Sequence, residues 1–146
     1  MESEFFEKFN LLLTKAINSI DNKQLVDTAE ILKEVKSSGK KIIVVGNGGS
    51  AAMASHVAVD LTKAAGCRAV TFNEADLLTC FANDYGYENW VEKAFNFYSD
   101  KGDVVILISS SGTSKNIING ANWAKNNLDS PAEYERFSAA ISNLLK

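Results

Sequence analysis

Apolar residues recur every three or four positions through the N-terminal part of the chain. Over residues 2–20 the repeated residues are mostly Phe, Leu and Ile, and this spacing predicts an amphipathic helix. After a polar break the pattern resumes over residues 25–35 and stops near Gly39, a residue type that commonly ends helices. We therefore expect an N-terminal helical hairpin over residues 1–38.

Two apolar runs without alternation come next, and such runs are typical of parallel strands that are covered on both faces. They are residues 42–45 and 104–108, and residues 68–72 form a shorter candidate strand. Helical patterns occupy residues 51–65, 74–81 and 88–98, and another follows Ser114. This order predicts an α/β fold with a parallel sheet, in which binding sites lie at the carboxyl ends of the strands.

The length of 146 residues fits one domain and is short for two. We expect three parts in it: N-terminal helices at 1–38, an α/β core at 41–127 and a C-terminal helix within 128–146, which Pro131 opens. No further strand is legible after the core. The sheet is therefore expected to hold only three strands.

The composition argues against two kinds of binding partner, membranes and nucleic acids. The chain is 46% hydrophobic and 23% charged, without an apolar run long enough to cross a bilayer and without a signal-peptide pattern at its start, so we expect a cytoplasmic protein with no membrane partner. A net charge of -3 with scattered basic residues argues against nucleic-acid binding. Cys67 and Cys80 are expected to be reduced, partly buried thiols.

A glycine-rich turn, Gly-Asn-Gly-Gly-Ser at residues 46–50, joins the first strand to a helix. Free backbone N–H groups and the helix dipole at such a turn favour an anion such as phosphate. The turn lacks the spacing of a dinucleotide fingerprint and the Lys of a P-loop. Glycines can also serve geometry alone. Asn47 and Ser50 favour a ligand site, because their side chains can bind hydroxyls as well as phosphate.

A second turn, Ser-Ser-Ser-Gly-Thr-Ser at residues 109–114, follows the third strand. Thr113 or Ser114 could simply cap the next helix. The turn nevertheless carries more hydroxyls than a cap requires. Because both turns fall at carboxyl ends of strands, the sequence predicts a site for a phosphorylated small molecule.

Two further pairs are candidate site residues. His56, the only histidine, and Asp60 lie four positions apart, a spacing that can hold a metal ion or pair an acid with a base, and that equally suits a simple surface contact. Asn83 and Asp84 are expected in a turn between helices, where they form either an Asx turn or a contact to a ligand hydroxyl.

These motifs together resemble the sugar isomerase (SIS) domain, and within it the chain is most similar to the phosphoheptose isomerase branch. The resemblance covers roughly residues 1–127 and rests on the turn at 46–50 with His56 and Asp60, the segment 83–87, and the segment 102–114. It implies a flavodoxin-like three-layer sandwich. It also implies a homo-oligomer, a dimer or tetramer, for which the N-terminal helices are candidate contacts. The family's sheet is normally five-stranded, so this chain is expected to be truncated.

The resemblance also implies roles for individual residues. It implies phosphate bound by Ser109, Ser110, Ser111 and Ser114, and sugar contacts from Asn47, Gly48, Gly49, Asn83 and Asp84. It further implies zinc bound through His56 and Asp60, with Asp60 as the proton-transfer base.

This chain departs from the family pattern at two points. The isomerases have Glu where this chain has Asp60, and they supply a Gln and a second His from a C-terminal helix, whereas this chain has one His. Three interpretations stay open. The first is an isomerase of sedoheptulose 7-phosphate that works through a cis-enediol, with Asp60 as base and a metal or His56 polarising the carbonyl. The others are a non-catalytic binding or regulatory module and a shortened derivative whose C-terminal helix covers the sheet.

Overall fold

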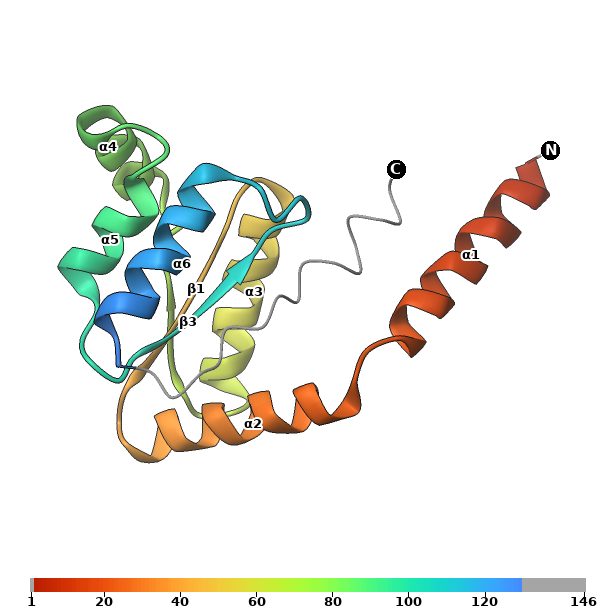
Figure 1. The fold of residues 1–146 in the computed structure, drawn as a ribbon, viewed down its shortest axis with the longest axis horizontal. Coiled ribbons are helices and arrows are strands. Elements are labelled where there is room, and N and C mark those ends of the chain that lie inside the picture. The colour runs from red at the N-terminus through yellow and green to blue at the C-terminus, as the bar shows by residue number, and fades with distance from the viewer. Residues whose placement is uncertain (1, 130–146) are drawn as a thin grey trace.

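The computed structural model describes residues 2–129; the predicted helix at Pro131 lies outside the described residues (Figure 1). The helices are α1 (Glu2–Asn18), α2 (Asn22–Ser37), α3 (Gly49–Lys63), α4 (Ala75–Tyr85), α5 (Trp90–Tyr98) and α6 (Lys115–Asn127). The strands are β1 (Lys41–Gly46), β2 (Arg68–Thr71) and β3 (Val104–Ile108). They form one parallel sheet of order β2-β1-β3. Within the described part of the chain, the expected three strands are confirmed.

Strand β1 lies at the centre of the sheet and is covered on both faces. Its four branched side chains, residues 42–45, are all 0% exposed, which explains why the sequence shows no alternation there. In its register with β3, Gly46 pairs with Ile108. Both strands therefore end at the same level, and the turns that follow them start side by side.

Helices cover the two faces of the sheet, α2 and α3 on one and α5 and α6 on the other, and α4 packs against α5 (Figure 1). Ile42 and Val44 pack with Ala54 of α3 on the first face. Ile43 and Val45 pack on the second face with the buried rings of α5, Trp90 and Phe95. The predicted α/β fold class with a parallel sheet is confirmed.

Helix α2 ends in a Schellman motif at Gly39. Gly39 has a φ of 71°, the left-handed region that a residue without Cβ adopts easily. The amide of Gly39 donates to the carbonyl of Lys36 at 3.1 Å, and the amide of Lys40 donates to the carbonyl of Val35 at 3.0 Å. The predicted glycine stop is confirmed, and it turns the chain directly into β1.

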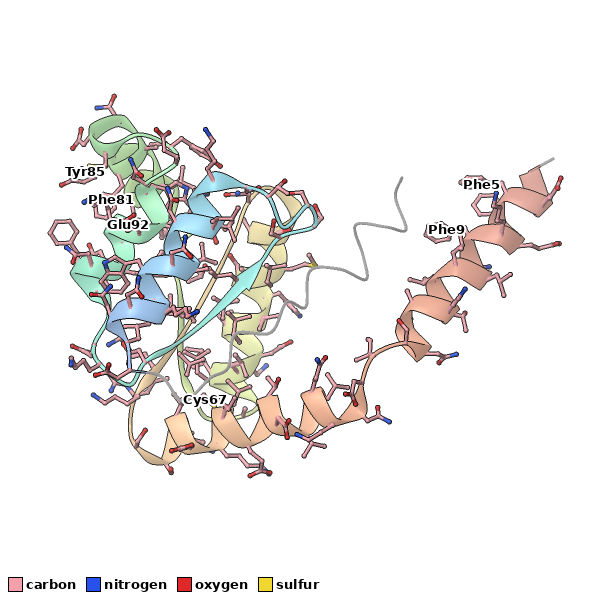
Figure 2. The ribbon with its side chains drawn as sticks, viewed as in Figure 1. Phe5, Phe9, Cys67, Phe81, Tyr85 and Glu92 are labelled. Carbon is pink, nitrogen blue, oxygen red and sulfur yellow. The ribbon has the colours of Figure 1, made fainter. Side chains whose placement is uncertain are left out.

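The N-terminal helices do not form the expected hairpin. Helix α1 ends at Asn18, slightly earlier than expected, and it diverges from α2 and from the α/β body (Figure 1). A hairpin requires apolar faces that meet along both helices. Here the apolar side chains of α1 point to solvent instead, among them Phe5 and Phe9, which are labelled in Figure 2.

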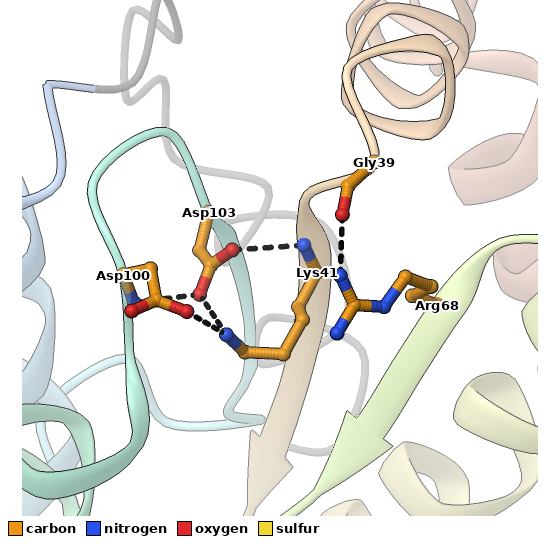
Figure 3. Close-up of polar contacts among 5 residues, drawn as sticks. All are labelled: Gly39, Lys41, Arg68, Asp100 and Asp103. Atoms are coloured by element: carbon orange, nitrogen blue, oxygen red, sulfur yellow. Dashed lines mark hydrogen bonds and ion pairs between the residues drawn. The ribbon is translucent and has the colours of Figure 1, made fainter.

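A buried ionic cluster joins the amino ends of β1 and β3 (Figure 3). Asp103 is 0% exposed and accepts hydrogen bonds from the backbone amides of Lys41 and Asp100, both at 2.8 Å. The Lys41 ammonium lies 2.9 Å from Asp103 Oδ2 and 2.6 Å from Asp100 Oδ2. Burial lowers the pKa of Lys41, but the hydrogen bonds and negative charges of Asp100 and Asp103 outweigh it and leave that pKa above 10.5.

Both cysteines are free thiols: Cys67 is buried beside α3 and Cys80 is exposed on α4 (Figure 2). Among residues 2–129, no helix has the length and apolar content that a bilayer span requires.

Candidate functional site

The turn between β1 and α3 depends on glycines at two positions. A Cβ on Gly46 would lie 2.5 Å from the backbone carbonyl of Ser50, so the turn folds back on its own helix only because that atom is absent. Gly48 has φ 55° and ψ -122°, a conformation that residues with a side chain rarely adopt. The glycine pattern at residues 46–50 thus has a geometric cause, which does not conflict with a ligand role.

Asn73 anchors this turn from the neighbouring strand. Its amide nitrogen donates to the carbonyl of Gly46 at 2.7 Å, and its amide oxygen accepts from the Gly46 amide at 3.1 Å. The side chain thereby continues the ladder of β2 by one more pair of bonds. Sequence reasoning did not single out Asn73. Its position just after β2, at the carboxyl edge of a parallel sheet, was the available signal.

The serine turn after β3 is shaped by its own hydroxyls. Ser109 Oγ accepts from the amide of Gly112 at 3.1 Å, and Ser111 Oγ accepts from the amide of Thr113 at 3.2 Å. Ser114 occupies the N-cap position of α6, yet its side chain makes no capping hydrogen bond. Its hydroxyl is therefore available to another partner.

The two turns meet at a pair of asparagines that are 69 positions apart in the chain. Asn47 Nδ2 donates to Asn116 Oδ1 at 3.0 Å, and Asn116 Nδ2 donates to Asn47 Oδ1 at 2.8 Å. The hydroxyl of Tyr87, from the loop between α4 and α5, also donates to Asn47 Oδ1 at 3.2 Å. Three segments that are remote in sequence thus converge on one side-chain amide.

A cavity of about 300 Å³ lies at this convergence. It is lined by Asn47, Tyr87, Glu88, Ser114, Lys115 and Asn116. The predicted site residues Asn47 and Ser114 are thus brought together. Gly48, Gly49 and Ser50 lie in the adjoining turn, and Ser109, Ser110 and Ser111 precede Ser114; none of these six lines the cavity itself.

The electrostatics of the cavity favour a ligand with one anionic group. Helices α3 and α6 both begin at its edge, and neither has a side-chain cap. The amides of Ser50, Ala51 and Ile117 already donate to backbone carbonyls, so the amides that precede them and the positive ends of the two helix dipoles are what a ligand can use. Lys115 adds a positive charge to the lining, while Glu88 supplies a carboxylate that can accept from hydroxyls. Phosphate and hydroxyl groups on one ligand would match this lining.

His56 and Asp60 lie on one exposed face of α3, outside the lining of that cavity. His56 Nε2 is 3.4 Å from Asp60 Oδ2, and the two side chains are 79% and 63% exposed. Catalytic zinc takes three protein ligands as a rule, and residues 2–129 contain no group of three or more His, Cys, Asp and Glu side chains that could hold a metal. The described residues of one chain therefore do not complete a zinc site.

The prediction that Asn83 and Asp84 lie in a turn is wrong. Both belong to the last turn of α4, which continues to Tyr85 and stops at Gly86, where φ is 87°. The apolar residues that pack on the core extend the helical period beyond the expected end, and the first residue able to end it is that glycine.

This placement separates Asn83 and Asp84 from the Asn47 cavity. Asn83 Nδ2 donates to Asp84 Oδ1 at 2.9 Å. Asp84 lines a different hollow of about 400 Å³, whose other residues are Cys80, Phe81, Tyr85, Phe97 and Tyr98. Within one chain, the pair does not face the two turns.

Tyr87, Lys115 and Asn116 are site residues that the sequence did not reveal. Lys115 and Asn116 directly follow the serine turn, which was the only local signal for them. Tyr87 belongs to the segment 83–87 on which the resemblance rests, but nothing in that segment shows that its hydroxyl reaches Asn47, a contact that only the fold of the loop between α4 and α5 creates.

The fold and the cavity define a class: an α/β sandwich with a cavity where two helices begin at the carboxyl ends of adjacent parallel strands. A model of the SIS domain family matches residues 4–127. The chain belongs to the SIS domain family.

The chain is similar to curated phosphoheptose isomerases. That of Geotalea daltonii is 38% identical over 100 residues, which cover 64% of this chain and 52% of the relative. That of Histophilus somni is 35% identical over 132 residues, 86% of this chain and 67% of the relative. The chain thus spans about half to two thirds of the length of these relatives.

The chain is also similar in fold to solved structures of phosphoheptose isomerases. The structure of phosphoheptose isomerase GmhA from Neisseria gonorrhoeae matches with a TM-score of 0.78 and 30% identity, over 99% of this chain and 78% of that chain. A phosphoheptose isomerase from Francisella tularensis shares the fold, with a TM-score of 0.77 at 22% identity over 88% of this chain and 68% of that one.

Proposed function

We propose that this protein binds a phosphorylated sugar in the Asn47 cavity and interconverts its aldose and ketose forms, with sedoheptulose 7-phosphate as substrate and a heptose 7-phosphate as product. The observation that carries the proposal is the convergence of the turns after β1 and β3 on one cavity, shown by the Asn47–Asn116 hydrogen bonds. The similarity to phosphoheptose isomerases supports the choice of substrate.

The phosphate group fits best at the start of α6. Ser114 offers a hydroxyl that caps nothing, Lys115 offers a positive charge, and the first amides of the helix offer N–H donors. Ser109, Ser110 and Ser111 extend the same turn and would contact the outer phosphate oxygens. The sugar then lies against Asn47 and the turn at Gly48, Gly49 and Ser50.

The proposed reaction moves one proton between neighbouring carbons. A carboxylate removes a proton from C1 of the open-chain ketose while the carbonyl oxygen at C2 gains a proton, which gives a cis-enediol. The proton then returns to C2 while the hydroxyl at C1 loses its proton, which leaves an aldehyde at C1. Atoms and electrons balance without an external oxidant or reductant.

Asp60 is the proposed base, and His56 at 3.4 Å is the group that orients its carboxylate. Asp60 lies eleven residues after Gly49, about 16 Å further along the helix axis at 1.5 Å per residue. A sugar anchored at the serine turn must therefore extend along α3 for its C1 to reach Asp60. Asn83 and Asp84 are further candidates for sugar contacts only from another copy of the chain.

Zinc remains a proposed partner of His56 and Asp60. These two side chains would supply two ligands, and the remaining ligands would have to come from outside the described residues of the same chain. Zinc would polarise the sugar carbonyl when bound. The proton transfer described above does not depend on it.

A second candidate function is phosphosugar binding without turnover, as in a regulatory module. The observation that favours it is the single histidine of the chain, His56, which leaves the acid–base set with one imidazole. The cavity around Asn47 and Ser114 would serve this function unchanged.

We further propose a homo-oligomer in the cytoplasm, assembled through α1. The seven large apolar side chains of this helix are each at least 40% exposed: Phe5, Phe6, Phe9, Leu11, Leu12, Leu13 and Ile17. A helix with this much apolar surface that projects from the body (Figures 1 and 2) is stable only if another surface covers it, and a second α1 is apolar in the same way.

One experiment separates the two candidate functions. The purified protein is incubated with sedoheptulose 7-phosphate, with and without zinc, and both the aldose product and the ligand-induced rise in Tm are measured. Product formation supports the isomerase, and stabilisation without product supports the binding module. A Ser114→Ala variant should lose most of the rise in Tm, while Ser37→Ala, at the end of α2, should keep it. Absence of both product and stabilisation would reject phosphosugar binding.

A further inference from the structure

The side-chain amide of Asn47 makes three hydrogen bonds to other side chains, out of the four that an amide can make. An amide oxygen can accept two hydrogen bonds and an amide nitrogen can donate two. Asn47 Oδ1 accepts from Asn116 Nδ2 at 2.8 Å and from the hydroxyl of Tyr87 at 3.2 Å, and Asn47 Nδ2 donates to Asn116 Oδ1 at 3.0 Å. Among the described residues, the second N–H of Asn47 Nδ2 has no partner, and Asn47 lines the cavity.

From this arrangement we infer that Asn116 and Tyr87 are positioning residues that hold Asn47 as a hydrogen-bond donor. The ligand group opposite Asn47 must then be an acceptor, such as a hydroxyl oxygen or the carbonyl oxygen of an open-chain sugar. The inference rests on the proposed phosphosugar function. It specifies that, in the contact between Asn47 and the sugar, Asn47 donates the hydrogen bond and a sugar oxygen accepts it.

The burial of Asn116 is what makes the amide orientation fixed. Asn116 lines the cavity but is only 2% exposed, so little of its surface is open to water that could replace Asn47 as a partner. Rotating the Asn47 amide by half a turn would place N–H against N–H and oxygen against oxygen, and both bonds to Asn116 would be lost. Tyr87 adds a third hydrogen bond to the Asn47 amide; because a hydroxyl can also accept, it stabilises the position of the amide, and the direction is set by the pairing with Asn116.

A positioning role differs measurably from a purely structural one. If Asn116 only held α6 against the first turn, its loss would weaken every ligand of the cavity by a similar factor. If Asn116 orients Asn47, its loss should weaken binding of the sugar and leave binding of the phosphate group nearly unchanged, because the proposed phosphate position is at Ser114 and Lys115. Inorganic phosphate and sedoheptulose 7-phosphate are therefore the two informative probes.

The test compares dissociation constants of both probes, measured by calorimetry. We expect Asn116→Ala and Asn47→Ala each to weaken sedoheptulose 7-phosphate binding about tenfold, the effect of one lost hydrogen bond of about 1.4 kcal/mol. The double variant should be no weaker than either single variant, and inorganic phosphate should change less than about twofold. Tyr87→Phe, at a 51% exposed position, should give a smaller loss in the same direction without damage to the core. Asn127→Ala, on the exposed end of α6, is the matched control and should change nothing.

Three results would overturn the inference: sugar phosphate binding that Asn116→Ala leaves unchanged, equal losses for both probes, or losses that multiply in the double variant. A ligand-free measurement keeps this outcome separate from failure of the proposed function. The NMR resonances of the Asn47 side-chain amide should shift in both Asn116→Ala and Tyr87→Phe, and unchanged resonances would also overturn the inference. A wild-type protein that binds neither probe rejects the proposed function, and the amide resonances then still decide whether Asn47 is positioned.

Discussion

Asp103 accepts hydrogen bonds from both the backbone amide of Lys41, at 2.8 Å, and its side-chain ammonium, at 2.9 Å. One fully buried carboxylate thus joins the starts of β1 and β3, the two strands whose other ends carry the candidate site. This carboxylate lies at the edge of the sheet opposite to the one that carries the glycine turn and the serine turn.

Removal of this carboxylate should be strongly destabilising. Asp103→Ala leaves two backbone amides without their partner and the Lys41 ammonium with only Asp100, and the loss of one partner from a buried ion pair costs about 3–5 kcal/mol. Urea denaturation with the linear extrapolation would measure the change. Asp100→Ala is the control, because the Asp100 side chain is 72% exposed and its loss should shift the midpoint much less. Equal losses for the two variants would contradict the buried pair.

The stability contributed by Lys41 should depend on pH. Its pKa in the folded protein lies above 10.5, so its contribution is fully present below the unfolded value and is lost as pH rises through the folded value. The hydrogen bond from Lys41 and its charge hold the pKa of Asp100 below 3.8, so that carboxylate's contribution is present above 3.8 and is lost as pH falls through the folded value.

Lys41→Met should therefore be less stable than the wild type at neutral pH, with a difference that shrinks toward both extremes of pH. Unfolding free energies of both proteins across the pH range would check this. Lys101→Met removes an exposed pair with Asp129, and solvent screening should make its effect small at every pH. A Lys41→Met difference that grows as the pH rises into the alkaline range would reject the assignment.

A methyl group at Gly46 should distort the first turn, whereas one at Gly49 should be tolerated. The Cβ of Gly46→Ala would lie 2.5 Å from the Ser50 carbonyl, and such overpacking costs about 1–3 kcal/mol. Gly49→Ala meets nothing within 4 Å and adds a better helix former to α3, so its stability should equal or exceed that of the wild type. Thermal unfolding would compare the two, and similar Tm values would contradict the close approach of Gly46 to Ser50.

A charge on the apolar surface of α1 should dissociate the proposed oligomer. Phe9→Glu would place a carboxylate in a surface that is buried only if copies of α1 meet, and its desolvation opposes assembly. Light scattering coupled to gel filtration should show a smaller mass for this variant than for the wild type. Lys8→Glu changes a charged position of the same helix and should keep the wild-type mass. A monomeric wild-type protein would reject the oligomer.

Several elements could be predicted from the sequence because their signals are local. The unbroken apolar run in β1 indicated a buried parallel strand, and the glycine at position 39 indicated the end of α2; both are confirmed. The end of α4 was predicted too early, which misplaced Asn83 and Asp84. The packing of α4 on the core overrode the polar residues near its end.

Some residues of the candidate site could also be predicted from local sequence, and others could not. Asn47 and Ser114 were identifiable because each lies in a turn whose composition is unusual by itself. Tyr87 and Asn116 were not, because their role consists of contacts across as many as 69 positions. The exposure of α1 also could not be read from its pattern, since an apolar stripe looks the same whether its own domain or another chain covers it.

The sequence by itself determined the class of fold, the positions of the glycine turn and the serine turn, and the glycine geometry, because backbone conformation and hydrophobic periodicity depend on neighbouring residues. Only the tertiary structure decided that the turns share one cavity and that Asn116 and Tyr87 hold Asn47 within it. Those contacts exist because the register of β1 and β3 places the ends of both strands at one level, and strand register is a property of the folded sheet.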